Sequence, residues 1–188
     1  MLQIHNISKR FGDKVLFTNR SLEINKGITV LMGPSGSGKT TFVNILCGLM
    51  APDTGHVTLP PETVIAMTFQ EDRLIEHATV LDNVLLPITS KSKTQALELL
   101  DKLDLSGESQ KKVYTLSGGM KRRVALCRSL LMPFTFLILD EPFKGLDDLT
   151  KSHVLELLQT YNDGEKYILI ISHDKAAVAE LHAPVLTL

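Results

Sequence analysis

The sequence predicts an α/β protein with a mainly parallel central sheet. Short β-type runs alternate with helical patterns along most of the 188 residues, an order typical of doubly wound sheets. A glycine-rich loop directly follows one buried strand-like run. The composition is 44% hydrophobic and 22% charged, which allows one globular domain with a sizeable core. We therefore expect residues 1–188 to form a single domain.

The N-terminal third predicts strands around one helix. The runs LQIHNIS and VLFTNRSLEI flank the turn sequence FGDK, which predicts an antiparallel hairpin. GITVLMG predicts a buried strand, and TTFVNILCGL predicts the helix that follows the glycine-rich loop. After the turn sequence APDTG, two more strands are expected at residues 56–60 and 63–69.

Residues 71–132 change to helical patterns. TQALELLDKLDL has leucines at helical spacing, and GGMKRRVALCRSLLM predicts a further helix. Strands and helices then alternate again, at residues 134–140, 149–161, 166–172, 174–182 and 183–188. We therefore expect a core lobe of about residues 1–70 and 133–188, including an N-terminal antiparallel β part, and an inserted helical subdomain of about residues 71–132.

Charge, cysteine content and hydropathy narrow the class of protein. The net charge is −1 and the pI is about 6.6, so bulk electrostatics give no indication of a nucleic-acid partner. Cys47 and Cys127 lie in apolar helix-like runs, which favours buried thiols in a reducing compartment over a disulfide. The N-terminal MLQIHNISKR lacks the apolar core of a signal peptide, and the apolar runs are shorter than the ~18 residues of a spanning helix. We expect a cytoplasmic protein that reaches a membrane only through a partner.

The glycine-rich loop GPSGSGKT, Gly33–Thr40, matches G-x-x-x-x-G-K-[ST] between a predicted strand and a predicted helix. In such a P-loop, backbone N–H groups and the helix N-terminus bind phosphate. Lys39 is expected to neutralise the β- and γ-phosphate oxygens, and the Thr40 hydroxyl to hold Mg²⁺. A chance match in a chain of this length has a probability below about 1%, so the sequence predicts a nucleoside triphosphate site. The other nucleotide-binding residues expected here are Gly33, Pro34, Ser35, Gly36, Ser37, Gly38 and Thr41.

Two adjacent carboxylates, Asp140 and Glu141, end the apolar run in FLILDEP. A carboxylate at the end of a buried strand beside a P-loop can organise Mg²⁺ through water, which is the role expected of Asp140. Glu141 points differently and can orient the attacking water or take its proton. Taken alone, the pair fits a solvated strand exit equally well, but the upstream P-loop favours the catalytic interpretation.

A second stretch, TLSGGMKRR, predicts a helix start with an unusually bare backbone. Ser117 can cap the helix, and Gly118 and Gly119 then expose its first turn. Each glycine in a helix costs about 0.5–1 kcal/mol relative to alanine, so these positions call for a reason. The basic cluster of residues 121–123 is interpreted as one face of this helix with ion pairs.

Taken in order, these motifs resemble the ATP-binding cassette (ABC) family of ATPases over essentially the full chain. LSGGM, residues 116–120, is similar to the family signature and lies between the P-loop and the LILDEP strand, as in that family. Gln70 in TFQED corresponds to the Q-loop, GLD at residues 145–147 to the D-loop, and His173 in IISHD to the H-loop. Phe11 stands where the family has an aromatic residue that stacks on adenine.

Some of these positions also have simpler interpretations. For Phe11, a role in stacking on adenine is favoured over a place in the hydrophobic core, because the residue lies in the turn KRFGDK. Gln70 alone is an ordinary polar strand end, and a lone histidine such as His173 is more often structural; its place after a strand favours a γ-phosphate sensor or proton partner. The remaining histidines lack metal-ligand spacing and receive no role: His5, His56, His77, His153 and His182.

The resemblance implies a head-to-tail dimer, either two copies of this chain or a pairing with a second cassette, that forms around two ATP molecules. Ser117, Gly118 and Gly119 then donate to the γ-phosphate bound by the P-loop of the partner subunit. The resemblance also implies that Glu141 and His173 position the attacking water. The Mg²⁺ ion is expected near Thr40, Gln70 and Asp140, and Asp147 is expected among the nucleotide-binding residues.

The segment FQEDRLIEHATVLDNVLLP resembles ABC importers of the nitrate, sulfonate and taurine type. In such importers the surface after the Q-loop receives a membrane permease, which acts with a solute-binding protein, so residues 71–83 are the expected transmission interface. The implied location is the inner face of the cell membrane. The sequence departs from this group at Lys144, where a small residue is common, at Ala177, and in its short C-terminus.

Two alternatives to an importer ATPase stay open at this point. One is a soluble ABC ATPase of repair, translation or iron–sulfur assembly, although heptad arms and a tandem second cassette are absent from the sequence. The other is a non-catalytic regulatory cassette, which the intact Lys39, Asp140, Glu141, Ser117 and His173 disfavour.

Overall fold

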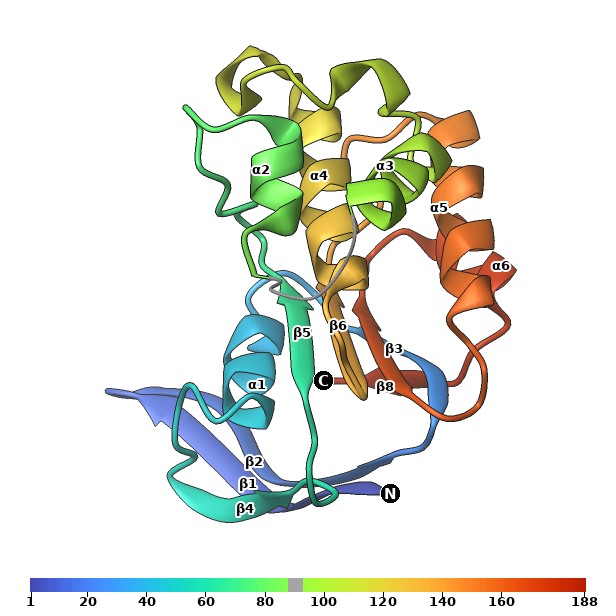
Figure 1. The fold of residues 1–188 in the computed structure, drawn as a ribbon. Coiled ribbons are helices and arrows are strands. Elements are labelled where there is room, and N and C mark those ends of the chain that lie inside the picture. Colours follow the sequence, from blue (N-terminus) through green and yellow to red (C-terminus); the bar gives the residue numbers. More distant parts are fainter. Residues whose placement is uncertain (88–92) are drawn as a thin grey trace.

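The structure, a computed structural model that describes residues 1–87 and 93–188, contains two sheets and a set of surrounding helices (Figure 1). The larger sheet is parallel, with strand order β5-β6-β7-β3-β8. Its strands are β3 (Gly27–Met32), β5 (Ile65–Thr68), β6 (Phe136–Asp140), β7 (Tyr167–Ile171) and β8 (Val185–Thr187). The smaller sheet is antiparallel in the order β2-β1-β4, with strands β1 (Leu2–Phe11), β2 (Lys14–Ile24) and β4 (Thr54–Thr58).

The helices divide into three groups in space (Figure 1). Helix α1 (Lys39–Leu46) lies between the two sheets, and α5 (Asp148–Thr160) and α6 (Lys175–Leu181) flank the parallel sheet. Helices α2 (Val80–Leu85), α3 (Lys93–Lys102) and α4 (Gly118–Leu131) form the helical region inserted between β5 and β6. Short 3₁₀ turns at Ser106–Glu108 and Val113–Thr115 join α3 to α4.

This architecture confirms the predicted fold class: a mainly parallel core sheet, an N-terminal antiparallel part and an inserted helical region. The predicted hairpin around FGDK is the β1–β2 pair. Residues 88–92 of the predicted helical subdomain lie outside the described residues. The boundaries at about 71 and 132 stay a prediction.

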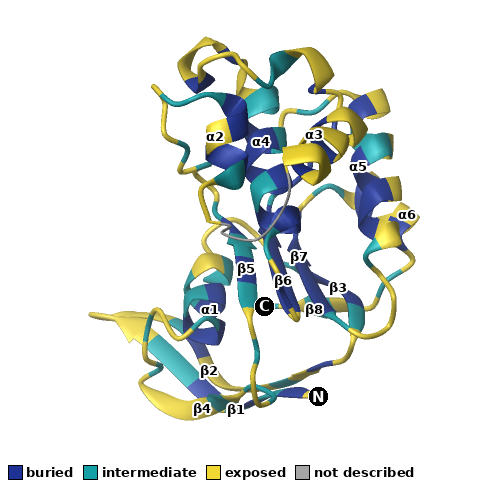
Figure 2. Ribbon diagram, viewed as in Figure 1, coloured by how far each residue is buried: buried dark blue, intermediate teal, exposed yellow. Residues whose placement is uncertain are grey.

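Two hydrophobic cores cover the two faces of the parallel sheet, because successive side chains of a strand point to opposite faces. In β6, Phe136 and Ile138 pack with α1 and the antiparallel sheet, whereas Leu137 and Leu139 pack with the helices of the other face. All five residues of β6 and all five of β7 are buried. Figure 2 shows the buried residues on the strands and on the inward faces of α4 and α5.

The parallel sheet brings three strand ends to one edge. In the register of the sheet, Leu31 of β3 lies beside Ile171 of β7, and Ile171 lies beside Asp140 of β6. The loops that leave these strands therefore start next to one another, although they begin at residues 33, 141 and 172. Ligands of open α/β sheets bind outside the carboxyl ends of the strands.

Two sequence expectations concern the whole chain. The predicted thiols are free within the described residues, with Cys127 buried and Cys47 half-buried. Burial raises the pKa of the Cys47 thiol to about 11, so neither a disulfide nor a reactive thiolate is indicated. In the described part of the chain, no helix has both the length and the apolar character needed to cross a membrane.

Candidate active site

A cavity of about 700 Å³ opens at the carboxyl edge of the parallel sheet. Most of the residues predicted to bind nucleotide form its wall: Phe11, Gly33, Pro34, Ser35, Gly36, Gly38, Lys39, Thr40, Thr41, Gln70, Asp140, Glu141 and His173. They come from segments as far apart in the sequence as Phe11 and His173, and the topology of the sheet brings them together. Lys14, Leu16 and Lys144 complete the wall.

The P-loop has the geometry of an anion cradle. Gly38 precedes α1 with φ of 96°, a conformation that favours glycine, and a Cβ there would make a tight contact of 3.3 Å with the Leu16 side chain. Lys39 folds back and donates to the carbonyl oxygens of Gly33 and Pro34, at 2.8 and 3.0 Å. The Ser37 hydroxyl is buried without a hydrogen-bond partner among the described residues. A phosphate bound by the loop fits this unsatisfied donor.

Asp140 ends β6 as a buried carboxylate, 5% exposed. Burial raises its pKa above the usual range, and the adjacent Glu141 adds to this effect. The positive charges of Arg122, Lys39 and Lys144 act in the opposite direction. A buried carboxylate beside the Thr40 hydroxyl in one cavity is a donor set that fits Mg²⁺.

Glu141 and His173 form a pair at the phosphate end of the cavity. The carboxylate Oε1 of Glu141 lies 2.8 Å from Nδ1 of His173. Glu141 adopts φ of 53°, a conformation that costs a non-glycine residue about 1–3 kcal/mol, and its amide donates to the carbonyl of Ile171 at 2.9 Å. The Glu141 side chain is 15% exposed and that of His173 is 71% exposed. The strained backbone therefore aims a partly shielded carboxylate into the cavity, with an imidazole beside it.

Phe11, Lys14 and Leu16 bring the β1–β2 hairpin into the cavity wall. Phe11 is 50% exposed, so the core interpretation of this residue is wrong. Nζ of Lys9 lies 5.6 Å from the centroid of its ring. An exposed aromatic face on the wall of a cavity can stack on a planar base.

Arginines of α4 hold the segment that contains Gln70. Arg122 is 7% exposed and donates to the carbonyl oxygens of Phe69 and Gln70, at 2.9 and 2.8 Å. Arg128, two turns further along α4, donates to the carbonyl of Asp72 at 2.9 Å. These bonds leave the side chain of Gln70 exposed at the cavity wall. Helix α4 thus connects the Gln70 segment directly to the serine–glycine turn at its own N-terminus.

The serine–glycine turn at residues 117–119 lies outside the cavity wall. Ser117 caps α4, accepting from the amide of Met120 at 3.3 Å, as the sequence predicts. The two glycines differ: a Cβ at Gly118 would meet nothing within 4 Å, whereas one at Gly119 would lie 2.9 Å from the carbonyl oxygen of Gly145. Gly119 is therefore bare because the Gly145 loop packs on it in the same chain, and Gly118 alone presents open backbone. Sequence reasoning treated both alike and missed this contact.

Asp147 is likewise absent from the cavity wall. Its carboxylate caps α5, accepting from the amide and the hydroxyl of Thr150, both at 2.9 Å. These bonds lower the pKa of Asp147. Within one chain, Asp147 has a structural role.

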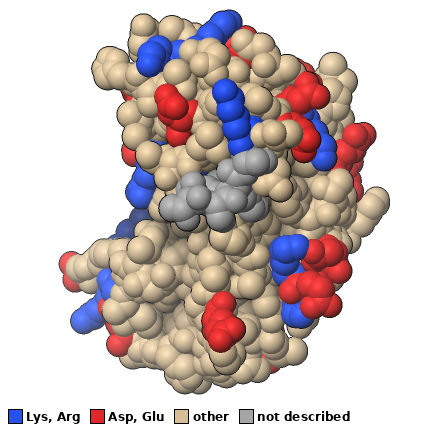
Figure 3. Space-filling view, viewed as in Figure 1, with Lys and Arg blue, Asp and Glu red and all other residues tan. Residues whose placement is uncertain are grey.

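The basic cluster at residues 121–123 is used in ion pairs, as predicted. Lys121 pairs with Glu76 at 2.9 Å, and Arg122 with Asp72 at 3.0 Å. On the face drawn in Figure 3, lysines and arginines are interspersed with aspartates and glutamates.

Three cavity residues were not predicted as binding residues. Lys14 and Leu16 lie on the β2 strand next to Phe11, and the proximity of a hairpin to the P-loop is not visible in sequence. Lys144 did stand out in sequence, because it departs from the small residue common at this position. This departure from the family pattern was the one feature of the sequence that could have indicated a role for Lys144.

A P-loop, a buried carboxylate at the end of a neighbouring strand and an aromatic side chain in one cavity define a nucleotide-binding protein of the P-loop class. The family described as "ABC transporter" matches residues 17–144 of the chain. The taurine import ATP-binding protein TauB of Yersinia pestis is 36% identical over 93% of this chain and 74% of its own length. The aliphatic sulfonates import ATP-binding protein SsuB 1 of Nocardia farcinica is 37% identical over 92% of this chain and 71% of its own.

Solved structures similar to this chain are also ABC cassettes. A dimeric "bacterial ABC transporter cassette" superposes with a TM-score of 0.86 at 28% identity, covering 100% of this chain and 94% of that one. A second structure with the same TM-score is described as a dimeric post-hydrolysis state bound to ADP and Pi. The chain therefore belongs to the ABC transporter family and is one of its ATP-binding cassettes.

Proposed function

We propose that this chain is the ATP-hydrolysing subunit of an ABC importer and acts on a separate membrane permease from the inner face of the cell membrane. The observation that carries the proposal is the meeting, in one cavity, of the P-loop, Asp140 and the Glu141–His173 pair. The relatives named as taurine and aliphatic sulfonate import proteins support the import direction.

In the proposed reaction, water attacks the γ-phosphorus of ATP in line with the bond to the leaving ADP oxygen. The Glu141 carboxylate orients this water and accepts its proton, and His173 holds the carboxylate in place. Lys39 and the P-loop amides hold the phosphate chain, while Phe11 stacks on adenine. Mg²⁺, held by Thr40, Asp140 and Gln70, supplies charge neutralisation on the phosphates when it is bound.

We further propose that two cassettes, two copies of this chain, pair head to tail around two ATP molecules. Gly118 supports this arrangement, because it lies at the N-terminus of α4, where backbone amides can bind an anion, and a Cβ there would meet no described atom within 4 Å. The dimeric cassette structures support it as well. In such a pair Ser117, Gly118 and Gly119 donate to the γ-phosphate on the partner's P-loop, and Asp147 also reaches the nucleotide site.

The surface after Gln70 is the proposed permease contact. Ile75 is 48% exposed and Tyr114 is 57% exposed, and the ring of Tyr114 lies 5.7 Å from that of His77. These apolar side chains adjoin the segment that Arg122 and Arg128 fix to α4. A permease helix seated here would therefore act on both the cavity and the signature turn.

Affinity purification in mild detergent tests the importer. The proposal predicts a multi-span membrane protein that co-purifies with the wild-type chain and is lost in Ile75→Asp, while Leu149→Asp, at an exposed side chain away from this surface, keeps it. Recovery of soluble partners alone would favour the soluble ABC ATPase. Absence of steady-state ATP hydrolysis with intact nucleotide binding would favour the regulatory cassette.

A further inference from the structure

Lys144 lies in the cavity wall but has no role in the proposed reaction. Lys144 lines the phosphate end of the cavity with Asp140, Glu141 and His173. It follows Glu141 by three positions, and its amide donates to the Glu141 carbonyl at 3.2 Å, which closes a turn. The turn fixes where the side chain of Lys144 begins relative to the catalytic carboxylate.

Lys144 forms no direct ion pair with a carboxylate among the described residues, although its charge acts on Asp140. By contrast, Lys9, Lys26, Lys121 and Lys151 each pair with a carboxylate. The two carboxylates nearest in sequence do not form an ion pair with Lys144. Oε1 of Glu141 contacts His173, and Asp140 is buried. Lys144 itself is exposed, so its ammonium group can reach the open side of the cavity.

The position of Lys144 indicates what anion it meets. Lys39 is the first residue of α1, and in the proposed site it binds the phosphates held by the P-loop. Lys144 follows Glu141 in the turn after β6 and lines the same cavity as the Glu141–His173 pair. In the proposed reaction this pair faces the terminal phosphate of the triphosphate. A diphosphate lacks this group. An ammonium–phosphate contact is a charge-assisted hydrogen bond, roughly twice as strong as a neutral one.

We propose that Lys144 binds the terminal phosphate of the nucleoside triphosphate and makes the site prefer ATP to ADP. The inference rests on the proposed nucleotide site and adds a second lysine to it. Lys144 supplies affinity for the state before hydrolysis, and loss of the terminal phosphate removes its partner. Loss of the contact thereby contributes to opening of the ATP-held dimer after hydrolysis.

Binding of two nucleotides to the full chain tests this inference. The dissociation constants for Mg·ADP and for Mg·AMP-PNP, which is not hydrolysed, are measured by calorimetry for the wild type and for Lys144→Met. The constant for AMP-PNP is expected to rise about tenfold, while that for ADP changes by less than about twofold. Lys144→Gln is expected to behave as Lys144→Met does, and Lys144→Arg to keep the preference.

Lys14→Met is the matched control, because Lys14 lines the same cavity from the β1–β2 hairpin and not from the turn after Glu141. It is expected to change both constants by the same factor. An equal change for both nucleotides in Lys144→Met, or no change in either, would overturn the role of Lys144 while leaving the nucleotide site intact. A wild-type chain that binds neither nucleotide would overturn the site and this inference together.

Discussion

Two helices of this molecule begin with a backbone ready to bind an anion, and they differ in what surrounds them. Helix α1 begins inside a cavity of about 700 Å³ with Lys39, Asp140 and Glu141 in its wall. Helix α4 begins at an exposed Ser117, and a side chain at Gly118 would meet open space. The same backbone chemistry thus lies inside a cavity in one place and on the surface in the other. In the proposed head-to-tail dimer, the exposed turn is half of a site whose phosphate comes from the second molecule.

The largest effect is expected from Glu141→Gln, which tests whether the cavity at the start of α1 is the site of hydrolysis. The variant keeps the P-loop and the signature turn, so it should bind ATP and accumulate as an ATP-held dimer. Loss of the carboxylate should lower the hydrolysis rate by roughly 10²–10⁴. Steady-state ATPase rates and size-exclusion chromatography with Mg·ATP measure the two effects. Turnover at the wild-type rate would contradict the assignment of Glu141 as the base.

Arg122→Met tests the physical connection between the two regions. It leaves two carbonyl groups and Asp72 without their buried cationic partner, which should cost about 3 kcal/mol and lower the Tm by about 6–12 °C. Lys121→Met, whose partner Glu76 is half exposed, should cost less than about 1 kcal/mol. Equal losses in the two variants would show that Arg122 does not anchor the Gln70 segment.

Much of this molecule was predictable from sequence. The alternation of strands and helices predicted the parallel sheet, and the P-loop predicted the cradle, because both depend on local pattern. The contact of Gly119 with Gly145 and the place of Lys14 in the cavity depend on tertiary packing between distant segments. No local signal in the sequence encodes them. The positive φ of Glu141, directly after the end of β6, was not predicted either, because glutamate at this position gives no local sign of it.

Alanine at each of the two signature glycines separates packing from phosphate binding. Gly119→Ala places a methyl group 2.9 Å from the Gly145 carbonyl, which should cost about 1–3 kcal/mol and lower the Tm by about 2–12 °C. Gly118→Ala meets open space and should leave the Tm unchanged or slightly raised, because alanine favours the helix. Thermal denaturation of both variants measures this. A loss of stability in Gly118→Ala equal to that in Gly119→Ala would break the distinction.

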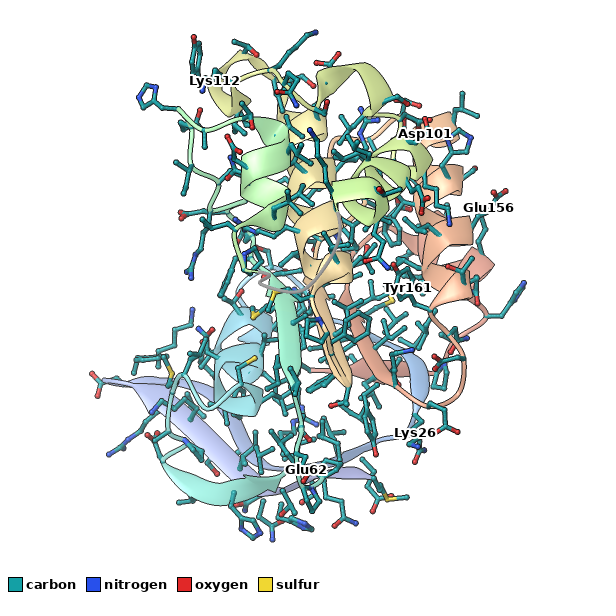
Figure 4. The ribbon with its side chains drawn as sticks, in the orientation of Figure 1. Lys26, Glu62, Asp101, Lys112, Glu156 and Tyr161 are labelled. Atoms are coloured by element: carbon teal, nitrogen blue, oxygen red, sulfur yellow. The ribbon has the colours of Figure 1, made fainter. Side chains whose placement is uncertain are left out.

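The smallest expected effect lies outside both regions, where α5 meets the end of α3. Nδ1 of His153 lies 2.9 Å from Oδ2 of Asp104, and this contact raises the pKa of His153. Arg123 also faces Asp104, at 3.9 Å. Asp101, Lys102 and Glu156 line the same small cavity, and Asp147 adds negative charge. Figure 4 labels Asp101 near the end of α3 and Glu156 on α5.

Because the folded-state pKa of His153 is raised, the stabilisation is complete below the unfolded pKa of about 6.5 and is lost as pH rises through the folded value. His153→Gln should therefore lower the Tm slightly near pH 6 and have no effect near pH 9. Melting curves of the two proteins across this range provide the check. A difference independent of pH would contradict the ion pair. ATP affinity is expected not to follow this profile, since neither His153 nor Asp104 lines the nucleotide cavity.

The most direct test of the shared site mixes two inactive variants. Glu141→Gln retains a working signature turn, and Gly118→Asp retains a working P-loop and Glu141, but each homodimer lacks one part of every site. In a mixed head-to-tail dimer, the P-loop of the Gly118→Asp chain meets the intact signature of the Glu141→Gln chain and forms one complete site. ATP hydrolysis should therefore reappear on mixing and be greatest near equal amounts. Hydrolysis that never exceeds the sum of the separate variants, although both bind ATP, would contradict the account.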